Sequence, residues 1–300
     1  MKYRKTFACA GLAAMMLLAF SAIASADSFS TVLVYGDSLS DNGNLYTAIG
    51  YPPSPPYYNG RFSNGPVAVE QLAAQLNMPL IDYAVGGATT GLGNYVDGGS
   101  QTQQGAFHLP GMAIEVATPL PPGLAANSLV VVWGGANDFF TGDSALQAAS
   151  NIDAIVATLE GEGATHILVP GMPDLGLTPE YLGNPFATLY AQTFNSAMQA
   201  SLPAGAVYVD TFGLLHQIVA DPSAYGFTDV TDPCFDKTAL TVCSDPSQYL
   251  FWDGVHPTTA ADAILADQFY AAATPEPSTI LMLTTGIAGL AGLLRRRRAA

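Results

Sequence analysis

Basic residues are almost absent from the body of this chain. Of its nine Lys and Arg residues, only Arg61 and Lys237 lie between residues 27 and 273, against 23 acidic residues in the same segment. That segment therefore carries a formal charge of −21. So acidic a surface repels phosphate backbones, which argues against nucleic acid as a partner and against capture by anionic lipid.

Cysteine is also scarce. The chain has three cysteines, and Cys9 falls within the N-terminal leader described below, which leaves Cys234 and Cys243 in one loop. Two cysteines without clustered histidines provide too few ligands for a zinc site, and we expect no metal and no cofactor. In a chain that is exported to an oxidising compartment, the two cysteines predict a disulfide.

The N-terminal segment 1–26 has the composition of a secretory signal peptide. It begins with Lys2, Arg4 and Lys5, continues with an apolar stretch over 7–20, and ends in the small residues 24–26. These are the three regions that a signal peptide requires, and we expect cleavage directly after residue 26.

The C-terminal segment 274–300 contains Pro275-Glu276-Pro277, an apolar run over 279–294 and four arginines at 295–298. The run is short for a membrane span, which needs about 20 residues, and the arginines would act as a cytoplasmic stop. The three parts in this order resemble the PEP-CTERM sorting tail of exosortase-bearing Gram-negative bacteria. The resemblance implies an exosortase-type processing enzyme as a partner and export across the inner membrane to the periplasm, cell surface or medium, with 279–294 as a transient membrane anchor. A plain C-terminal anchor is the alternative.

The body, residues 27–273, has the length of one α/β domain. Short apolar runs alternate with helix-length segments, a pattern typical of a mainly parallel sheet with helices on both faces. The predicted strands are 31–35, 80–85, 129–133, 166–170 and 207–211, and the predicted helices are 66–76, 144–160, 186–202, 212–220 and 258–273. A loop rich in Pro and Tyr over 51–58 is expected to be rigid and to lie over the cleft.

A hydroxyl follows the first predicted strand. The run 31–35 ends in Gly36-Asp37-Ser38, which predicts a tight turn that carries Ser38. In open α/β sheets, ligands bind outside the carboxyl ends of the strands, so Ser38 lies where a nucleophile would meet a substrate.

A base for that hydroxyl is found near the other end of the body. Asp253 and His256 are three residues apart in a loop after a strand-like run, so the carboxylate can orient the imidazole. The other histidines, His108, His166 and His216, lack such a neighbour, and we expect structural or solvent-exposed roles for them.

Donors for an oxyanion are expected at the ends of the next two strands. The candidates are the backbone N–H of Gly87, the side-chain amide of Asn137 and the N–H of Ser38 itself. Gly86 is the alternative to Gly87.

Together these segments resemble the SGNH, or GDSL, hydrolase family. The matching blocks are Gly36-Asp-Ser-Leu-Ser40, Asp82-Tyr-Ala-Val-Gly-Gly-Ala88, Gly135-Ala-Asn-Asp138 and Asp253-Gly-Val-His-Pro-Thr258. The segments Gly60-Arg-Phe-Ser-Asn-Gly65 and Leu250-Phe-Trp-Asp253 are similar to the subgroup of secreted bacterial phospholipase/haemolysins and plant GDSL lipases.

The resemblance implies a three-layer α/β/α fold with a flavodoxin-like sheet and the hydrolysis of carboxylic esters. Ser38 would be the nucleophile, His256 the base and Asp253 its orienter, with Ser38, Gly87 and Asn137 as the oxyanion hole. Asp37 would support the nucleophile turn through backbone hydrogen bonds. An acetyl-polysaccharide esterase or an acyltransferase would use the same triad, and a non-catalytic protein of the extracellular matrix is the third alternative.

Overall fold

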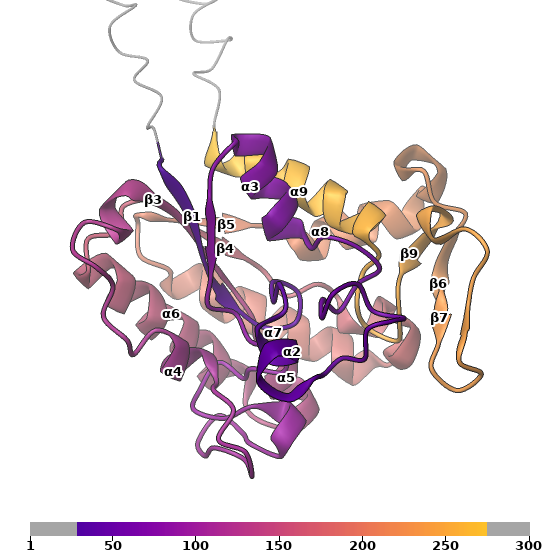
Figure 1. Ribbon diagram of the computed structural model, residues 1–300, viewed down its shortest axis with the longest axis horizontal. Coiled ribbons are helices and arrows are strands. Elements are labelled where there is room, and N and C mark those ends of the chain that lie inside the picture. Colours follow the sequence, from indigo (N-terminus) through magenta and orange to yellow (C-terminus); the bar gives the residue numbers. More distant parts are fainter. Residues whose placement is uncertain (1–28, 275–300) are drawn as a thin grey trace, which may run out of the picture. The chain divides into compact units, whose positions relative to one another are not determined.

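The computed structural model describes residues 29–274, so the predicted signal peptide, 1–26, and all but the first residue of the predicted sorting tail, 274–300, lie outside these residues. The five predicted strands and the five predicted helices are all present in the described part, together with further short helices and strands (Figure 1). Their bounds are β1 Thr31–Gly36, α2 Asn44–Ile49, α3 Ala68–Leu76, β2 Leu80–Asp82, α4 Met112–Glu115, β3 Ser128–Trp133, α5 Ala136–Thr141, α6 Ala145–Gly161, β4 Ile167–Pro170, α7 Pro185–Ser201, β5 Ala206–Val209, α8 Thr211–Ala220, β6 Asp229–Pro233, β7 Phe235–Asp236, β8 Thr241–Val242, β9 Tyr249–Phe251 and α9 Thr259–Ala273.

The central sheet has five parallel strands in the order β2-β1-β3-β4-β5. β1 and β3 are buried over their whole length, as expected for strands that are covered on both faces. They pair from Thr31 with Ser128 to Gly36 with Trp133. At Gly36 a Cβ would lie 2.3 Å from the Trp133 carbonyl oxygen, so this pairing requires glycine.

Helices cover both faces of the sheet, which confirms the predicted α/β/α architecture. On one face, α6 and α7 pack their apolar sides against strand residues such as Leu33, Val130 and Ile167. On the other face, α3 and α9 pack against Val32 and Val131 (Figure 1). The carboxyl ends of the five parallel strands therefore all lie at one edge of the sheet, between the two layers of helices.

The segment between α8 and α9 differs from a simple strand–helix alternation. The strand-like run before Asp253 does not join the central sheet, because β9 pairs in parallel with β6 in a separate two-stranded sheet. An antiparallel hairpin of β7 and β8 lies beside it. The pairing of β6 with β9 joins Asp229 to Tyr249, which are distant along the chain, whereas β7 and β8 pair locally.

Several predicted bounds were too long. The strand predicted over 80–85 ends at Asp82, and the one predicted over 207–211 ends at Val209. In the first case the hydrogen bonds to β1 continue past Asp82, since the N–H groups of Tyr83 and Val85 donate to the carbonyl oxygens of Val34 and Gly36 at 2.9 and 3.1 Å.

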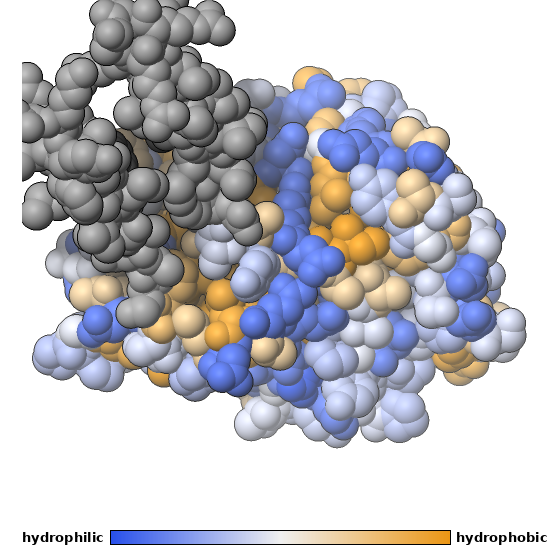
Figure 2. All heavy atoms as spheres, turned by 90° about the horizontal axis from the view of Figure 1, so that it is seen from above, coloured by the Kyte–Doolittle hydropathy of each residue, from blue (hydrophilic) through white to orange (hydrophobic). Residues whose placement is uncertain are grey.

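The surface of the described part mixes polar and apolar side chains. Figure 2 shows hydrophilic and apolar residues interspersed on the face seen from above. Within residues 29–274, no helix is long and apolar enough to cross a membrane.

Candidate active site

Ser38 lies in a tight turn directly after β1. The Asp37 carbonyl oxygen accepts the N–H groups of Ser40 and Asp41 at 3.0 and 2.9 Å, and the Asp37 carboxylate accepts the N–H of Leu39 at 3.1 Å. These bonds close the turn and hold Ser38 at the carboxyl edge of the sheet, where its side chain is 9% exposed. Asp37 thus makes the backbone contacts that the sequence predicts for it.

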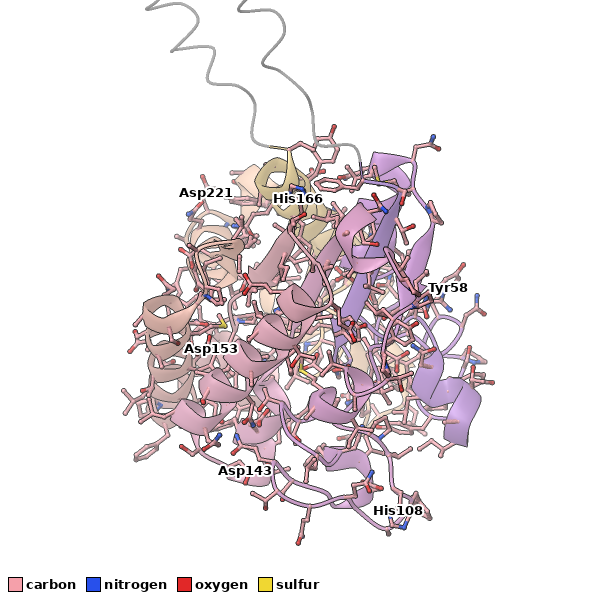
Figure 3. The ribbon with its side chains drawn as sticks, turned by 90° about the vertical axis from the view of Figure 1, so that its left-hand side faces the viewer. Tyr58, His108, Asp143, Asp153, His166 and Asp221 are labelled. Carbon is pink, nitrogen blue, oxygen red and sulfur yellow. A yellow bond between two sulfur atoms is a disulfide. The ribbon has the colours of Figure 1, made fainter. Side chains whose placement is uncertain are left out.

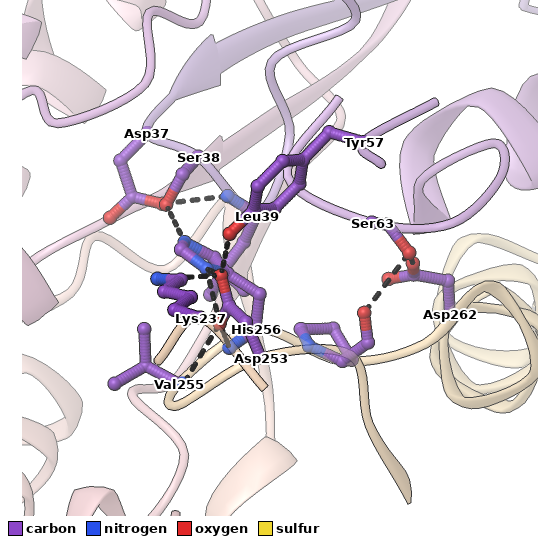
Figure 4. A network of polar contacts seen from close by, with 11 residues as sticks. Asp37, Ser38, Leu39, Tyr57, Ser63, Lys237, Asp253, Val255, His256 and Asp262 are labelled. Carbon is purple, nitrogen blue, oxygen red and sulfur yellow. Dashed lines mark hydrogen bonds and ion pairs between the residues drawn. The ribbon is translucent and has the colours of Figure 1, made fainter. Parts of the chain in front are cut away.

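His256 connects Ser38 to Asp253 (Figure 4). Its Nε2 lies 2.8 Å from Ser38 Oγ, and its Nδ1 lies 2.9 Å from both carboxylate oxygens of Asp253. Asp253 Oδ1 also accepts the N–H groups of Val255 and His256 at 3.0 and 2.9 Å. With a proton on Nδ1, this geometry leaves Nε2 as an acceptor for the serine hydroxyl proton.

Two further side chains contact the buried carboxylate of Asp253, and sequence reasoning missed both. The Tyr57 hydroxyl donates to Oδ2 at 2.5 Å, and Lys237 Nζ lies 3.0 Å from the same oxygen (Figure 4). The predicted rigid loop 51–58 therefore contributes a hydrogen-bond donor at the site. The one available hint for Lys237 was its rarity, since it is one of two cations in the body.

These neighbours set the charge state of Asp253. Burial acts to raise its pKa, but the charge and hydrogen bond of His256, the charge of Lys237 and the hydrogen bond of Tyr57 together hold that pKa well below its ordinary value. The Lys237 pKa is raised, because the carboxylate outweighs burial, which acts to lower it. Asp253 is therefore an anion with a cation beside it.

The geometry separates the two glycines proposed for the oxyanion site. The N–H of Gly86 donates to the Asp41 carboxylate at 2.7 Å and is therefore occupied. Within the described residues, the N–H groups of Gly87 and Ser38 have no recorded acceptor. Gly87 has φ +84°, a conformation that favours glycine. Of the two glycines, Gly87 has the available donor.

The Asn137 amide is engaged within the protein. Its Nδ2 donates to Asp37 Oδ2 at 3.2 Å and to the Ala88 carbonyl oxygen at 3.1 Å. Both bonds are long, and an anionic acceptor beside Ser38 would compete with them. Burial raises the pKa of Asp37 to about 7, although Leu39, His256 and Asn137 act to lower it.

An apolar pocket opens beside Ser38 and His256. It has a volume of about 80 Å³ and runs between α8, α9 and β9. Apart from the site residues, its walls are almost entirely apolar, and they include Leu39, Phe140, Leu175, Leu214, Leu215, Ile218, Phe251, Val255 and Leu265. Such a pocket accommodates a hydrocarbon chain next to the hydroxyl.

The other histidines lie away from this site. His108 is in a loop at one end of the molecule and His166, whose ring meets Phe29 edge-on, is at the other (Figure 3). His216 is half exposed, with Nε2 2.9 Å from Asp174 Oδ2. All three have the structural or exposed positions that the sequence predicts.

The β7–β8 hairpin is closed by a disulfide. Cys234 and Cys243 are bonded, with their Cα atoms 4.8 Å apart, and Lys237 lies between them. In the part of the chain that the structure describes, no group of three or more His, Cys, Asp or Glu could hold a metal ion.

The fold and the site are those of an α/β/α hydrolase. The chain belongs to the GDSL-like lipase/acylhydrolase family, whose model matches residues 32–269, and residues 273–298 match the PEP-CTERM protein-sorting motif. This motif indicates export to the cell envelope or surface.

Similar proteins include esterases and an acyltransferase. The chain is 26% identical to the phosphatidylcholine-sterol acyltransferase of Aeromonas hydrophila, over 88% of this chain and 95% of that protein. It is 31% identical to esterase EstA of Pseudomonas aeruginosa, over 81% of this chain but 46% of that longer protein. Among solved structures, an acetylxylan esterase of Geobacillus stearothermophilus is 14% identical, with a TM-score of 0.48 over 82% of this chain and 94% of that one.

Proposed function

We propose that this protein is an exported serine hydrolase that cleaves carboxylic esters through an acyl-enzyme intermediate, with residues 27–273 as its catalytic domain. The observation that carries the proposal is the unbroken chain of short contacts from Ser38 Oγ through His256 to Asp253. A hydroxyl with an oriented base is what nucleophilic acyl transfer requires.

In the first step, Ser38 Oγ attacks the ester carbonyl carbon while His256 Nε2 takes the hydroxyl proton. The anionic oxygen of the tetrahedral intermediate accepts the N–H groups of Ser38 and Gly87, and Asn137 Nδ2 turns to it from Asp37. The intermediate collapses when the bond to the alcohol oxygen breaks and His256 returns the proton to that oxygen. The alcohol leaves, and Ser38 carries the acyl group.

The second step repeats the chemistry with an acceptor. Water enters beside His256, loses a proton to Nε2 and attacks the acyl carbon, and Ser38 leaves with that proton as the carboxylic acid forms. Asp253 stays ionised throughout and stabilises the imidazolium. An alcohol in place of water would give acyl transfer, the activity named for the Aeromonas hydrophila relative.

The pocket supports an acyl group longer than acetate. Its walls offer hydrocarbon contacts that extend well past the reacting carbon, and each buried CH₂ contributes about 0.8 kcal/mol. The apolar lining favours a lipase or esterase over an acetyl-polysaccharide esterase, because the hydroxyl groups of a sugar would find few hydrogen-bond partners in it.

The sorting motif supports a proposal for where in the cell this reaction takes place. We propose that residues 1–26 direct export, that the segment 279–294 holds the chain in the inner membrane, and that an exosortase-type enzyme processes the tail. The substrate would then be an ester outside the cytoplasm.

The test is a panel of p-nitrophenyl esters from acetate to palmitate with the purified protein. Ser38→Ala is expected to lower kcat by at least about 10⁴-fold. Ser40→Ala is the matched control, because it removes a buried hydroxyl from the same turn that has no hydrogen-bond partner in the structure. Activity that survives in Ser38→Ala, or a wild-type protein inactive on every ester, would contradict the proposal and favour a binding role in the extracellular matrix.

A further inference from the structure

The carboxylate beside His256 is held by more than the imidazole. Asp253 is fully buried, and its Oδ2 receives both the Tyr57 hydroxyl and the Lys237 ammonium. Tyr57 supplies a neutral donor, whereas Lys237 supplies a full positive charge. A cation here changes the electrostatics of every step in which His256 gains or loses a proton.

Backbone hydrogen bonds hold the hairpin that carries Lys237 against the segment that carries Asp253. The N–H groups of Cys234 and Phe235 donate to the carbonyl oxygens of Phe251 and Trp252 at 3.0 and 2.7 Å, directly before Asp253. The hairpin strand β7 is thus bonded to the segment that carries the carboxylate. This arrangement directs Lys237, two residues after Phe235, at Oδ2.

An aromatic cluster of Tyr57, Phe235 and Trp252 fills the space behind these contacts. Phe235 stacks on Trp252 with ring centroids 5.8 Å apart, and the Tyr57 ring meets both edge-on. The Cys234–Cys243 disulfide closes the hairpin next to this cluster. Both donors to Asp253 Oδ2 therefore extend from a single packed unit.

Basic residues are rare in the body, and one of the two that it contains lies against Asp253. Of its two cations, Arg61 pairs with Glu70 at 2.6 Å and Lys237 pairs with Asp253. The remaining charge of the body is strongly negative. The positive charge of Lys237 reduces the negative potential at Asp253 and His256.

From these contacts we infer that Lys237 is a positioning residue that orients Asp253 and extends to lower pH the range in which His256 is an available base. This inference rests on the proposed function. When His256 takes a proton, the imidazolium becomes a second cation beside one carboxylate. Lys237 therefore disfavours the protonated resting form, in which Nε2 has no lone pair for the Ser38 proton.

Other charged or titratable groups also face this unit. Asp37 faces His256 from the nucleophile turn, and Tyr51 and Glu180 act on Lys237 from two other loops. Tyr57 faces Asp253 as a neutral phenol, because burial and the carboxylate both raise its pKa. None of these groups is a cation, so the positive charge at Asp253 Oδ2 comes from Lys237.

The test is the pH profile of kcat/KM for Lys237→Met, measured on the full chain with a p-nitrophenyl ester from pH 4.5 to 9 at constant ionic strength. We expect the acid limb to move to higher pH by about half a unit to one unit, with KM little changed. Lys237→Arg, which keeps the charge, is expected to restore most of the wild-type profile.

Arg61→Met is the matched control, since it removes the other cation of the body and changes the net charge equally. It is expected to leave the acid limb in place. Lys237→Gln serves as a second neutral variant if Lys237→Met does not fold, as judged by its near-ultraviolet circular dichroism.

Three outcomes would overturn the inference. They are a uniform loss of activity at all pH values, a profile identical to wild type in both neutral variants, and an equal shift in Arg61→Met. Failure of the proposed function would look different, since the wild-type protein would then be inactive or Ser38→Ala would retain activity.

Discussion

The imidazole of His256 lies against the phenyl ring of Phe62, with ring centroids 4.9 Å apart and planes inclined by 36°. Phe62 is buried and belongs to the segment Gly60-Arg-Phe-Ser-Asn-Gly65. The next residue in that segment, Ser63, donates to the Pro257 carbonyl oxygen at 3.0 Å. A segment almost 200 residues earlier in the chain thus contacts the loop of the proposed base at two adjacent residues.

Replacing Phe62 by Leu should loosen the base while keeping apolar volume at its side. We expect kcat to fall by about tenfold with little change in KM, because a small displacement of a catalytic group is costly. Steady-state kinetics measure this, and Phe107→Leu, at a ring that is 70% exposed, is the control. A kcat equal to wild type would show that the Phe62 ring does not orient His256.

Removing the Tyr57 hydroxyl should weaken the support of Asp253. In Tyr57→Phe the ring stays in the aromatic cluster, but Oδ2 loses one donor, and we expect kcat to fall by about tenfold. The exposed neighbour provides the control, Tyr58→Phe, which is expected to behave as wild type. Equal kcat values for the two variants would show that the Tyr57 hydroxyl does not support Asp253 in the reaction.

The folded protein should become less stable as pH rises from 4 to 8. Burial raises the pKa of Asp37 to about 7 and that of Asp138 to about 6, so the folded state binds more protons than the unfolded chain above about pH 4. The free energy of unfolding therefore decreases as these groups ionise on the way to pH 7. Self-repulsion of the acidic body acts in the same direction, whereas the lowered pKa of Asp253 matters only below this range.

Urea denaturation at a series of pH values measures this dependence. Asp37→Asn is expected to flatten the curve between pH 5 and 8, whereas Asp232→Asn, at an exposed position, should leave its slope unchanged. A free energy of unfolding that increases from pH 5 to 8 would contradict the burial argument.

Filling the apolar pocket should shorten the preferred acyl chain. Leu215 lines the pocket from α8. Leu215→Trp is expected to lower kcat/KM for octanoate by about tenfold relative to acetate, because the larger indole would occupy space that the octanoyl chain needs. Gln217→Trp, on the exposed side of the same helix, is the control. An unchanged octanoate-to-acetate ratio would place the acyl chain elsewhere.

By itself, the sequence determined the parallel sheet, its helical layers and the identity of Ser38, Asp253 and His256 as candidates. Strand and helix periods are local properties, and the chemistry of a Ser turn or of a nearby Asp–His pair can be recognised within a few residues. The carboxyl-edge rule predicted the place of Ser38, but it does not account for Asp253 and His256, which follow a strand of a separate sheet.

Only the tertiary structure decided what surrounds them. It assigned Gly86 to Asp41 and left the Gly87 N–H available, and it brought Tyr57 and Lys237 onto Asp253. Tyr57 and Asp253 are 196 residues apart in the chain, and no period or spacing encodes such a contact. It arises because two loops and a disulfide-closed hairpin pack their apolar side chains together, and that packing determines where their polar ends lie.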